Sequence, residues 1–519
     1  MRGVWTPERI RAAEQRLFDT VPEPVVMRRA ANGVALHVRR LLGRRHGRVA
    51  GRHVTLLVGA GNNGGDALWA GALLRRRGVG VTAVLLAPDR THTEGLRALR
   101  AAGGRVVPAE TESGLSPEAA GALRRGDVVV DGVVGLSARG GLRPLAAEAV
   151  AHIAGPVVAV DLPSGVDPVT GAVDGVAVSA EITVTFGCLR PCHVLGEGAR
   201  RSGRVRVVDI GLDPWLEAPD FSVPEAVDVG SLWPVPDRED DKYTQGVLGV
   251  AAGSASFPGA AMLTSAGAVR AASGMVRYAG PAADAVRERW PEVVATGSVG
   301  DAGRVQAWSV GPGIGTGGSG REVLAAVLEE GRPVVADADA ITLLASDITL
   351  WDARDPDVPV VLTPHDGEFA RLTGSAPRDR VSEAVRAARR YDVVLLLKGN
   401  STVVAAPDGR VLVYPCGQSW PATAGSGDVL TGMIGKLLAA GLDPLWACGC
   451  AVLVHARAAE IAATGSDPAP GGATGTGESS SEEVGAPIGA SALVEAVPAA
   501  IRETRAAALG DPRVPRPPR

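Results

Sequence analysis

The sequence predicts an α/β protein made of two successive series of strands and helices. Short apolar runs that are typical of buried strands alternate with helical patterns twice along the 519 residues. Each series also contains a glycine-rich turn that ends in aspartate, Gly61–Asp66 and Gly425–Asp428, between an apolar or small-residue run and a helical pattern. Alternation of this kind is typical of parallel, doubly wound sheets, in which ligands collect at the carboxyl ends of the strands.

In the first series, Thr6 is expected to cap a helical arm that starts at Pro7. The turn Gly61–Asp66 should be a loop, followed by an amphipathic helix over Ala67–Arg77. Glycines allow a ligand to approach the backbone closely, and the N–H groups at a helix N-terminus favour an anion. Strands are expected at 53–58, 80–86, 127–134, 156–160, 182–186 and 204–209.

The spacing of this turn is not G-x-G-x-x-G, so we expect a nucleotide-like substrate rather than a domain for hydride transfer. A tight turn without a ligand is the alternative, but it does not need the two amides of Asn62 and Asn63. Further polar segments follow the third strand, at 131–141, and the fourth, at 161–165. They should meet the turn at one edge of the sheet.

A segment rich in Pro and Asp, 213–241, is expected to be a linker to the second series. We expect 463–487, rich in Gly, Ser, Thr and Pro, to be a disordered surface insertion, and 511–519 to be a loose tail. Strands of the second series are expected at 247–252, 304–310, 333–336, 358–362, 393–397 and 402–405.

Composition argues against several classes of function. The net charge of −4 provides no basic field for nucleic acid. The longest apolar candidate, Pro444 to Val454, has 11 residues, is too short to span a membrane and is expected to be a buried helix. The first residues lack the apolar core of a signal peptide. We therefore expect a cytoplasmic protein that binds neither nucleic acid nor membranes.

The five cysteines are expected to be reduced thiols, because their number is odd and no secretory signal precedes them. Cys188 and Cys192-His193 have the residue types of a metal site, but no second ligand pair follows at a suitable distance.

Lysine is rare: only Lys242, Lys398 and Lys436 occur. A position that keeps lysine in an arginine-rich chain can need the compact ammonium, and a solvated charge is the alternative. Lys398 is the best candidate, because it ends an apolar run and precedes a turn suited to a phosphate.

The second glycine-rich turn has the chemistry of a kinase. Small residues at Gly425–Gly427 open a helix whose first N–H groups form an anion hole, and Asp428 stands where it can remove a proton from an attacking hydroxyl. This loop-plus-aspartate resembles the ribokinase superfamily. The order of the preceding motifs resembles the ADP-dependent NAD(P)H-hydrate dehydratases more specifically; they are Ser309–Gly315, Asp337–Ala340, Leu362–Phe369 and Leu397–Gly399.

The N-terminal half resembles the NAD(P)H-hydrate epimerases. The motifs are Asn-Asn-Gly-Gly-Asp at 62–66, Asp131-Gly132 and Asp-Leu-Pro-Ser-Gly at 161–165. Together the halves resemble the bifunctional repair enzymes. The resemblance implies a Rossmann-like epimerase domain over 1–218 and a ribokinase-like α/β dehydratase domain over 219–510. It also implies repair of NADHX and NADPHX, the hydrates of NADH and NADPH, with ADP as co-substrate, and we expect a homo-oligomer.

The resemblance further implies the site residues. In the epimerase half, Asp161 is catalytic and K⁺ is bound by Asn63, Asp131 and Ser164. The hydrate contacts there are Asn62, Asn63, Gly64, Gly65, Asp66, Gly135, Leu136, Ser137, Ala138, Arg139, Gly140, Gly141 and Asp161. In the dehydratase half, Asp428 is catalytic and contacts the hydrate with Ala260, Gly313 and His365. ADP, with Mg²⁺, is held by Lys398, Gly399, Asn400, Ser401, Thr402 and Gly427.

The sequence departs from the family pattern at four places. Ala67 and Ala424 stand where the family has Gly, Leu136-Ser137 replaces Thr-Gly, and Asp366 replaces Pro. Two alternatives stay open at this point. One is a vitamin-precursor kinase fused to an inactive domain. The other is an N-terminal half that binds a nucleotide or a protein without turnover.

Overall fold

The chain forms two compact units, Arg2–Phe221 and Ser222–Arg519, the second including Met1. The sequence placed the boundary after residue 218. The computed structural model describes residues 1–112, 114–136, 139–272, 274–415, 417, 419–465 and 485–511. Ser137, Ala138, Cys416, most of the expected insertion and residues 512–519 of the expected tail lie outside the described residues.

The sheet of the N-terminal unit is parallel throughout, in the order β10-β9-β8-β7-β2-β3-β4. All six strands expected here are present, and β4 was missed because Arg105–Pro108 is short and largely exposed at the sheet edge. Its strands are β2 (His53–Val58), β3 (Gly80–Leu85), β4 (Arg105–Pro108), β7 (Val128–Gly132), β8 (Val157–Val160), β9 (Ile182–Phe186) and β10 (Arg204–Val208). Three short strands lie outside this sheet: β1 (Arg2–Val4), β5 (Glu110–Thr111) and β6 (Gly114–Leu115).

Helices cover both faces of this sheet, as expected for a doubly wound fold. Neighbouring residues of β2 show why: Leu56 belongs to the core under one set of helices and Leu57 to the core under the other. The first set is α1 (Pro7–Phe18), α2 (Glu23–His46), α3 (Asn62–Arg75) and α4 (Thr93–Ala101). The second set is α5 (Pro117–Arg125) and α6 (Pro144–Ala151), and α7 (Gly196–Arg201) precedes β10.

The prediction that Gly61–Asp66 forms a loop is wrong, because α3 already begins at Asn62. Gly61 takes a φ of 105°, a backbone conformation that favours glycine, and turns the chain directly from β2 into the helix. At Gly64 a side chain would approach the carbonyl oxygen of Gly59 to 2.4 Å. The helix is also buried on most sides rather than amphipathic. The asparagines and Asp66 therefore belong to the first helical turns.

The sheet of the C-terminal unit runs in the order β11-β20-β19-β18-β17-β16-β15-β12-β13-β14. It is parallel except that β19 is antiparallel to both β18 and β20. The six expected strands are present, and β11, β13, β14 and β20 were missed. The strands are β11 (Phe221–Val223), β12 (Val247–Ala251), β13 (Met275–Ala279), β14 (Val294–Thr296), β15 (Ala307–Val310), β16 (Val334–Ala336), β17 (Val360–Leu362), β18 (Val394–Leu397), β19 (Ser401–Ala405) and β20 (Val411–Pro415).

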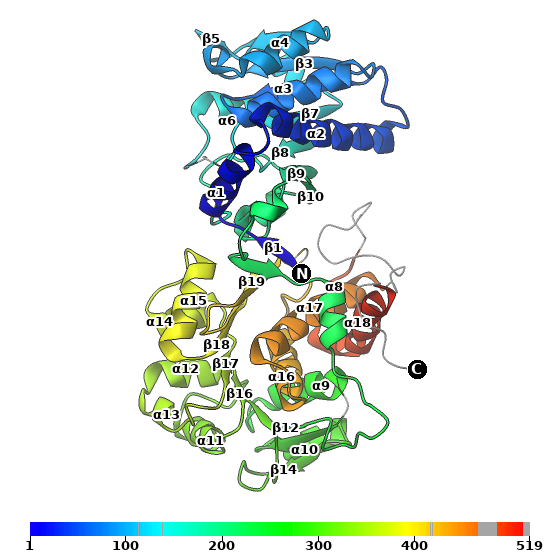
Figure 1. Ribbon diagram of the computed structural model, residues 1–519. Coiled ribbons are helices and arrows are strands. Elements are labelled where there is room, and N and C mark those ends of the chain that lie inside the picture. The colour runs from blue at the N-terminus through cyan, green and yellow to red at the C-terminus, as the bar shows by residue number, and fades with distance from the viewer. Residues whose placement is uncertain are drawn as a thin grey trace. The chain divides into compact units, whose positions relative to one another are not determined.

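Two layers of helices enclose this sheet (Figure 1). One layer forms the main core with the sheet and consists of α8 (Ala226–Leu232), α9 (Pro258–Ala271), α10 (Ala283–Arg289), α16 (Ser426–Ala439), α17 (Pro444–Thr464) and α18 (Ala490–Gly510). The other consists of α11 (Gly318–Glu329), α12 (Asp339–Ser346), α13 (Thr349–Asp352), α14 (Asp366–Thr373) and α15 (Arg380–Tyr391). The expected linker 213–241 is partly structured, since it contains β11 and α8.

Helix α17 extends well beyond the apolar run from which it was expected. Its 21 residues are long and apolar enough to cross a membrane, but 72% of its apolar window is buried inside the protein. It packs against α16, α18 and the strands β19 and β20. Burial of this kind is typical of a core helix. The helix reaches Thr464, so the start of the expected insertion is helical.

Each sheet has one point at which the order of its strands reverses along the chain. In the N-terminal unit this point lies between β2 and β7, and in the C-terminal unit between β12 and β15. The loops that leave two such strands diverge to opposite faces and leave a crevice at their carboxyl ends. Gly59–Asn63 and Val133–Leu136 border the first crevice, and Gly253 and Gly311–Gly313 border the second.

Candidate functional site

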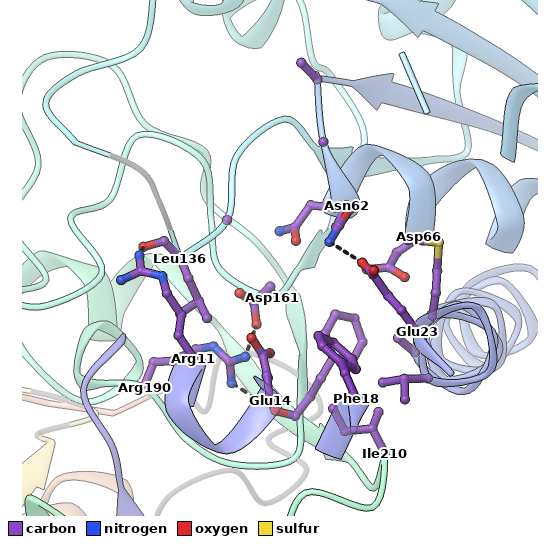
Figure 2. A pocket seen from close by; sticks show the side chains of 18 of the residues that line it. Arg11, Glu14, Phe18, Glu23, Asn62, Asp66, Leu136, Asp161, Arg190 and Ile210 are labelled. Atoms are coloured by element: carbon purple, nitrogen blue, oxygen red, sulfur yellow. Dashed lines mark hydrogen bonds and ion pairs between the residues drawn. The ribbon is translucent and has the colours of Figure 1, made fainter. Parts of the chain in front are cut away.

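A cavity of about 460 Å³ opens at the crevice of the N-terminal unit. Its walls come from α1, α2, the N-terminus of α3, the loop after β7 and the residues after β8 (Figure 2). It brings together most of the predicted hydrate contacts that precede residue 137, with Asp161. The acidic and basic side chains that line it are Arg11, Glu14, Glu23, Asp66, Asp161 and Arg190.

Asp161 is held in this cavity by a buried ion pair. Its Oδ1 lies 2.7 Å from Nη2 of Arg190 and accepts a hydrogen bond of 3.2 Å from the Thr185 hydroxyl. Both charged side chains are buried, with 4% exposure for Asp161 and 1% for Arg190. Burial raises the pKa of Asp161, while Arg190 and Thr185 act against that rise. The buried guanidinium needs a carboxylate as counter-ion, so the pair is best described as ionised.

The backbone around Asp161 is strained. Its φ is 71°, in the left-handed region that residues other than glycine rarely adopt. The Nε2 of His193 lies 2.8 Å from the Asp161 carbonyl oxygen, and Nδ1 of the same ring accepts from the amide of Arg190 at 3.1 Å. Neither Arg190 nor His193 was predicted to act in the site. The sequence signal for both was the Cys188–His193 segment, considered there as a metal site.

The metal interpretation of that segment gains no support. Both ring nitrogens of His193 have protein partners, and Cys188 and Cys192 are buried free thiols whose pKa values are raised by burial. Within the described ranges, no group of three or more His, Cys, Asp or Glu side chains is placed to hold a metal ion. The segment instead supplies Arg190 and His193 to Asp161.

Oxygen atoms converge beside this cavity where the potassium site was predicted. The Asp131 carboxylate is fully buried and accepts hydrogen bonds from the Ser164 hydroxyl at 2.7 Å and the Ser164 amide at 2.8 Å. The Asn63 amide nitrogen donates to the carbonyl oxygens of Val134 and Val160 at 2.8 and 2.9 Å. Burial raises the pKa of Asp131, and no basic side chain pairs with it in the described part of the chain.

A second hollow of about 920 Å³ adjoins the first, with Ala60 and Val133 common to both. The predicted loop 135–141 is divided between them: Gly135 and Leu136 line the first cavity, whereas Arg139, Gly140 and Gly141 line the second. Ser137 and Ala138 lie outside the described residues, and Gly64 and Gly65 lie within α3 and line neither cavity. The basic side chains that line the second hollow are Arg90, Arg139 and Arg143.

In the C-terminal unit, Lys398 forms an ion pair across the sheet edge. Its Nζ lies 2.7 Å from Oδ1 of Asp337, which follows β16, and the Thr431 hydroxyl donates to the other oxygen of Asp337 at 2.8 Å. The next residue, Ala338, has a φ of 52°. A Cβ at Gly427 would lie 3.6 Å from both Asp337 and Lys398. The residues that follow β16 and β18 therefore meet at the N-terminus of α16.

Asp428 lies in the first turn of α16, after Gly425 with a φ of 83°. Burial raises the pKa of Asp428 to about 7; the negative charge of Asp337 adds to the rise and Lys398 opposes it. A carboxyl group with a pKa near neutrality can accept and return a proton at physiological pH. In the sequence, Asp337 stood out only as part of the motif Asp337–Ala340; in the structure it pairs with Lys398 and its charge acts on Asp428.

A cavity of about 690 Å³ lies beside this group. It is lined by five of the six predicted nucleotide contacts: Lys398, Gly399, Asn400, Thr402 and Gly427. The sixth, Ser401, lies in β19 with its side chain buried and does not line the cavity.

The predicted hydrate contacts of this unit form two groups. His365 lines the same cavity as the nucleotide contacts and caps α14, with Nδ1 accepting from the Gly367 amide at 3.0 Å. The second group lies where the strand order of this sheet reverses, between β12 and β15. Gly313 has a φ of 68° there, and a Cβ on it would lie 3.1 Å from the Cβ of Ala260.

The three lysines have three different environments. Lys242 is exposed beside the Tyr243 ring. Lys436 is fully buried and donates to the Gly246 carbonyl oxygen at 2.6 Å, so it is not a solvated charge. Lys398 is paired with Asp337 at the cavity. The scarcity of lysine therefore marked one structural position and one position in the candidate site.

Comparison with known proteins assigns each half of the chain to a family. Residues 23–192 match the family model described as YjeF-related protein N-terminus, and 248–469 match the NAD(P)H-hydrate dehydratase model. A bifunctional NAD(P)H-hydrate repair enzyme of Mycobacterium leprae is 51% identical over 475 residues, covering 91% of this chain and 96% of the relative. The chain belongs to the bifunctional NAD(P)H-hydrate repair enzymes. It is therefore an enzyme with an epimerase and a dehydratase domain.

A more distant repair enzyme also covers most of the chain. The Escherichia coli relative is 31% identical and covers 79% of this chain and 81% of its own length. Among solved structures, an ADP/ATP-dependent NAD(P)H-hydrate dehydratase from Bacillus subtilis, co-crystallised with ATP and Mg²⁺, is 29% identical. It covers 54% of this chain and 97% of its own, with a TM-score of 0.45.

Proposed function

We propose that the C-terminal unit uses the β-phosphoryl group of ADP to dehydrate the hydrate. The observation that carries this proposal is Asp428, a carboxyl with a pKa of about 7 at the N-terminus of a helix, next to Lys398 and a cavity lined by glycines and small polar residues. Asp428 removes the proton of the C6 hydroxyl, whose oxygen attacks the phosphorus, and AMP leaves. The C6–O bond then breaks, phosphate departs and a proton is lost from C5, which restores the double bond.

Lys398 and the helix N-terminus stabilise the charge that develops on the transferred phosphoryl group. Lys398 is held by Asp337 at 2.7 Å, so that its ammonium is positioned before the nucleotide binds. The absence of a side chain at Gly427 keeps the space between Asp337, Lys398 and the cavity open. These contacts support a phosphoryl-transfer site and favour a compact cation over the wider fork of arginine.

The N-terminal unit converts one C6 epimer of the hydrate into the other. We place the hydrated ring in the cavity with Asp161, where carboxyl groups face a neutral ring, and the phosphates toward Arg90, Arg139 and Arg143 of the adjoining hollow. Asp161 acts on the C6 hydroxyl during opening and reclosure of the ring. The ion pair with Arg190 keeps its carboxylate available for this step.

The residues present fit a potassium ion. Asp131 is a buried carboxylate without a basic partner, and the nearby donors are all oxygens, which suit a hard cation. The amide nitrogen of Asn63 lies between the carbonyl oxygens of Val134 and Val160, and rotation of that amide would offer its oxygen instead. Asn63, Asp131 and Ser164 would hold the ion, which would order the loop after β7.

Magnesium is proposed to arrive with the nucleotide. Mg²⁺ in phosphoryl-transfer sites takes most ligands from phosphates and water and needs one or two protein carboxylates. This fits a region in which the described residues offer no cluster of three metal-ligating side chains. We also propose a cytoplasmic homo-oligomer; the four cysteines among the described residues are free and buried, which is consistent with a reducing compartment.

One experiment tests both activities. Pure protein is incubated with mixed hydrate epimers and ADP while the absorbance of reduced nicotinamide is followed. Full recovery of absorbance, with release of AMP and phosphate, supports the proposal. A stable phosphorylated product would instead favour a small-molecule kinase. Recovery that stops after one epimer is used up would favour a non-catalytic N-terminal module.

A further inference from the structure

One wall of the epimerase cavity comes from α1, which lies before the region matched by the epimerase family model. Arg11, Glu14 and Phe18 are spaced i, i+3 and i+7 along this helix, so they share one face, and all three line the cavity. The neighbouring face, with Ile10, Ala13 and Leu17, is buried in the core and fixes the helix in place. One wall of the cavity is therefore a helix that contains none of the predicted site residues.

Glu14 and Asp161 share the cavity but have opposite surroundings. Asp161 is paired with Arg190 at 2.7 Å and accepts from Thr185. Glu14 has no ion pair within 4.0 Å and no hydrogen-bond partner in the described residues, although its carboxyl group is directed towards Asp161 and Arg190 (Figure 2). A carboxylate in this position would be poorly stabilised, whereas a neutral carboxylic acid is tolerated.

Opening of the hydrated ring requires two proton transfers. A base takes the proton of the C6 hydroxyl, the C6–N1 bond breaks so that C6 becomes an aldehyde carbon, and N1 gains a proton. Reclosure on the other face of the aldehyde reverses both transfers and gives the opposite epimer. The reaction therefore needs one carboxylate and one carboxylic acid, which are regenerated together at the end of each turnover.

We infer that Glu14 is a second catalytic residue of the epimerase, the acid that protonates N1 while the Asp161 carboxylate takes the proton of the C6 hydroxyl. This inference rests on the proposed epimerase function. It explains why an acidic side chain of α1 faces a cavity in which Asp161 already has a basic partner.

The charges around Glu14 agree with this role. Burial raises its pKa, the nearby Asp161 and Glu23 add to the rise, and Arg190 and Arg11 oppose it. Asp66 also faces the group, and burial raises the pKa of Asp66 well above its ordinary value. Since Glu14 acts as an acid, epimerisation should be lost as pH rises through its pKa. Since Asp161 acts as a carboxylate, activity should be lost at low pH.

The test is Glu14→Gln in the full-length protein, with Glu118→Gln as a matched control on α5 of the same unit, where the Glu118 side chain is 51% exposed. Interconversion of separated epimers is measured against pH. We expect Glu14→Gln to lower kcat on the order of 10²-fold, to leave KM within about threefold and to lose the decline at high pH. Dehydration of the S epimer should stay at the wild-type rate, which shows that the C-terminal unit is intact, and the unchanged KM for epimerisation shows that the N-terminal cavity is intact.

Two results would overturn the inference. One is a wild-type rate of epimerisation by Glu14→Gln; the other is a decline of the rate at high pH that is still present in this variant, which would assign the decline to Asp66. Glu14→Ala with added formate is the second measurement, because a small acid can occupy the vacated space and should restore part of the rate. Failure of formate to restore any activity to folded Glu14→Ala would count against a proton-transfer role. If the wild-type protein does not epimerise at all, the proposed function fails instead.

Discussion

The dehydration rate should depend on pH through Asp428, and Asp337 should set where that dependence lies. Burial raises the pKa of Asp428 to about 7, the charge of Asp337 adds to the rise, and Lys398 opposes it. A base acts in its ionised form, so the rate should rise with pH and level off above about 7. One pH unit below that value only about a tenth of Asp428 is ionised, and the rate should fall in proportion.

Asp337→Asn removes the negative charge without changing the size of the side chain. Asp428 then loses a like charge, and Lys398 is no longer neutralised by its partner at 2.7 Å. Both effects favour the ionised form of Asp428 and lower its pKa. We expect the acid side of the pH profile to move to lower pH by on the order of one pH unit, equivalent to about 1.4 kcal/mol.

The assay is kcat for dehydration of the S epimer at saturating ADP, measured from about pH 5 to 9 by the absorbance of reduced nicotinamide. Asp347→Asn is the control, because Asp347 pairs with Arg321 at the surface of the same unit. An unchanged profile in Asp337→Asn would refute the electrostatic argument. A profile with the same acid side in Asp428→Asn would show that another group is the base.

Four further outcomes are expected. Asp428→Asn should lower dehydration by on the order of 10²–10⁴ and spare epimerisation, which separate assays of the two steps will check. Lys398→Arg should weaken ADP binding, because a planar fork replaces the compact ammonium; unchanged affinity by calorimetry together with an unchanged rate would contradict this. Asp161→Asn should make repair of mixed epimers biphasic; a single phase at the wild-type rate would mean that Asp161 has no catalytic role. Replacement of K⁺ by tetramethylammonium should slow epimerisation in the wild type.

The sequence predicted the parts of the fold whose residues are continuous and apolar. Runs such as His53–Val58 and Ile182–Phe186 are buried strands because their neighbours cover both faces. Strands with mixed exposure, such as Arg105–Pro108 and Met275–Ala279, lack that signal and were missed. The start of α3 at Asn62 was also missed, because asparagines and glycines are typical of loops and the helix there is fixed by tertiary packing.

The residues of the candidate sites were also only partly predictable from the sequence. Motif residues after the strands, Asp161 and Asp428, lie where doubly wound topology places them. The charged residues beside Asp161 come from segments without a motif: its ion-pair partner Arg190 from a loop considered for metal binding, and Glu14, which lines the same cavity, from a helix far away in the sequence. Such neighbours depend on how distant segments fold together. A single sequence offers no pattern for them.

Both sites place a non-glycine residue in the left-handed backbone region, Asp161 at a φ of 71° and Ala338, next to Asp337, at 52°. Each such residue costs on the order of 1–3 kcal/mol, and the only other non-glycine example in the described residues is Asp392. The two strained positions differ in what holds them. Selection of this chain for heat resistance alone should favour glycine at 338, whereas at 161 the buried Arg190 guanidinium needs the carboxylate, so the strain there is kept together with the catalytic side chain.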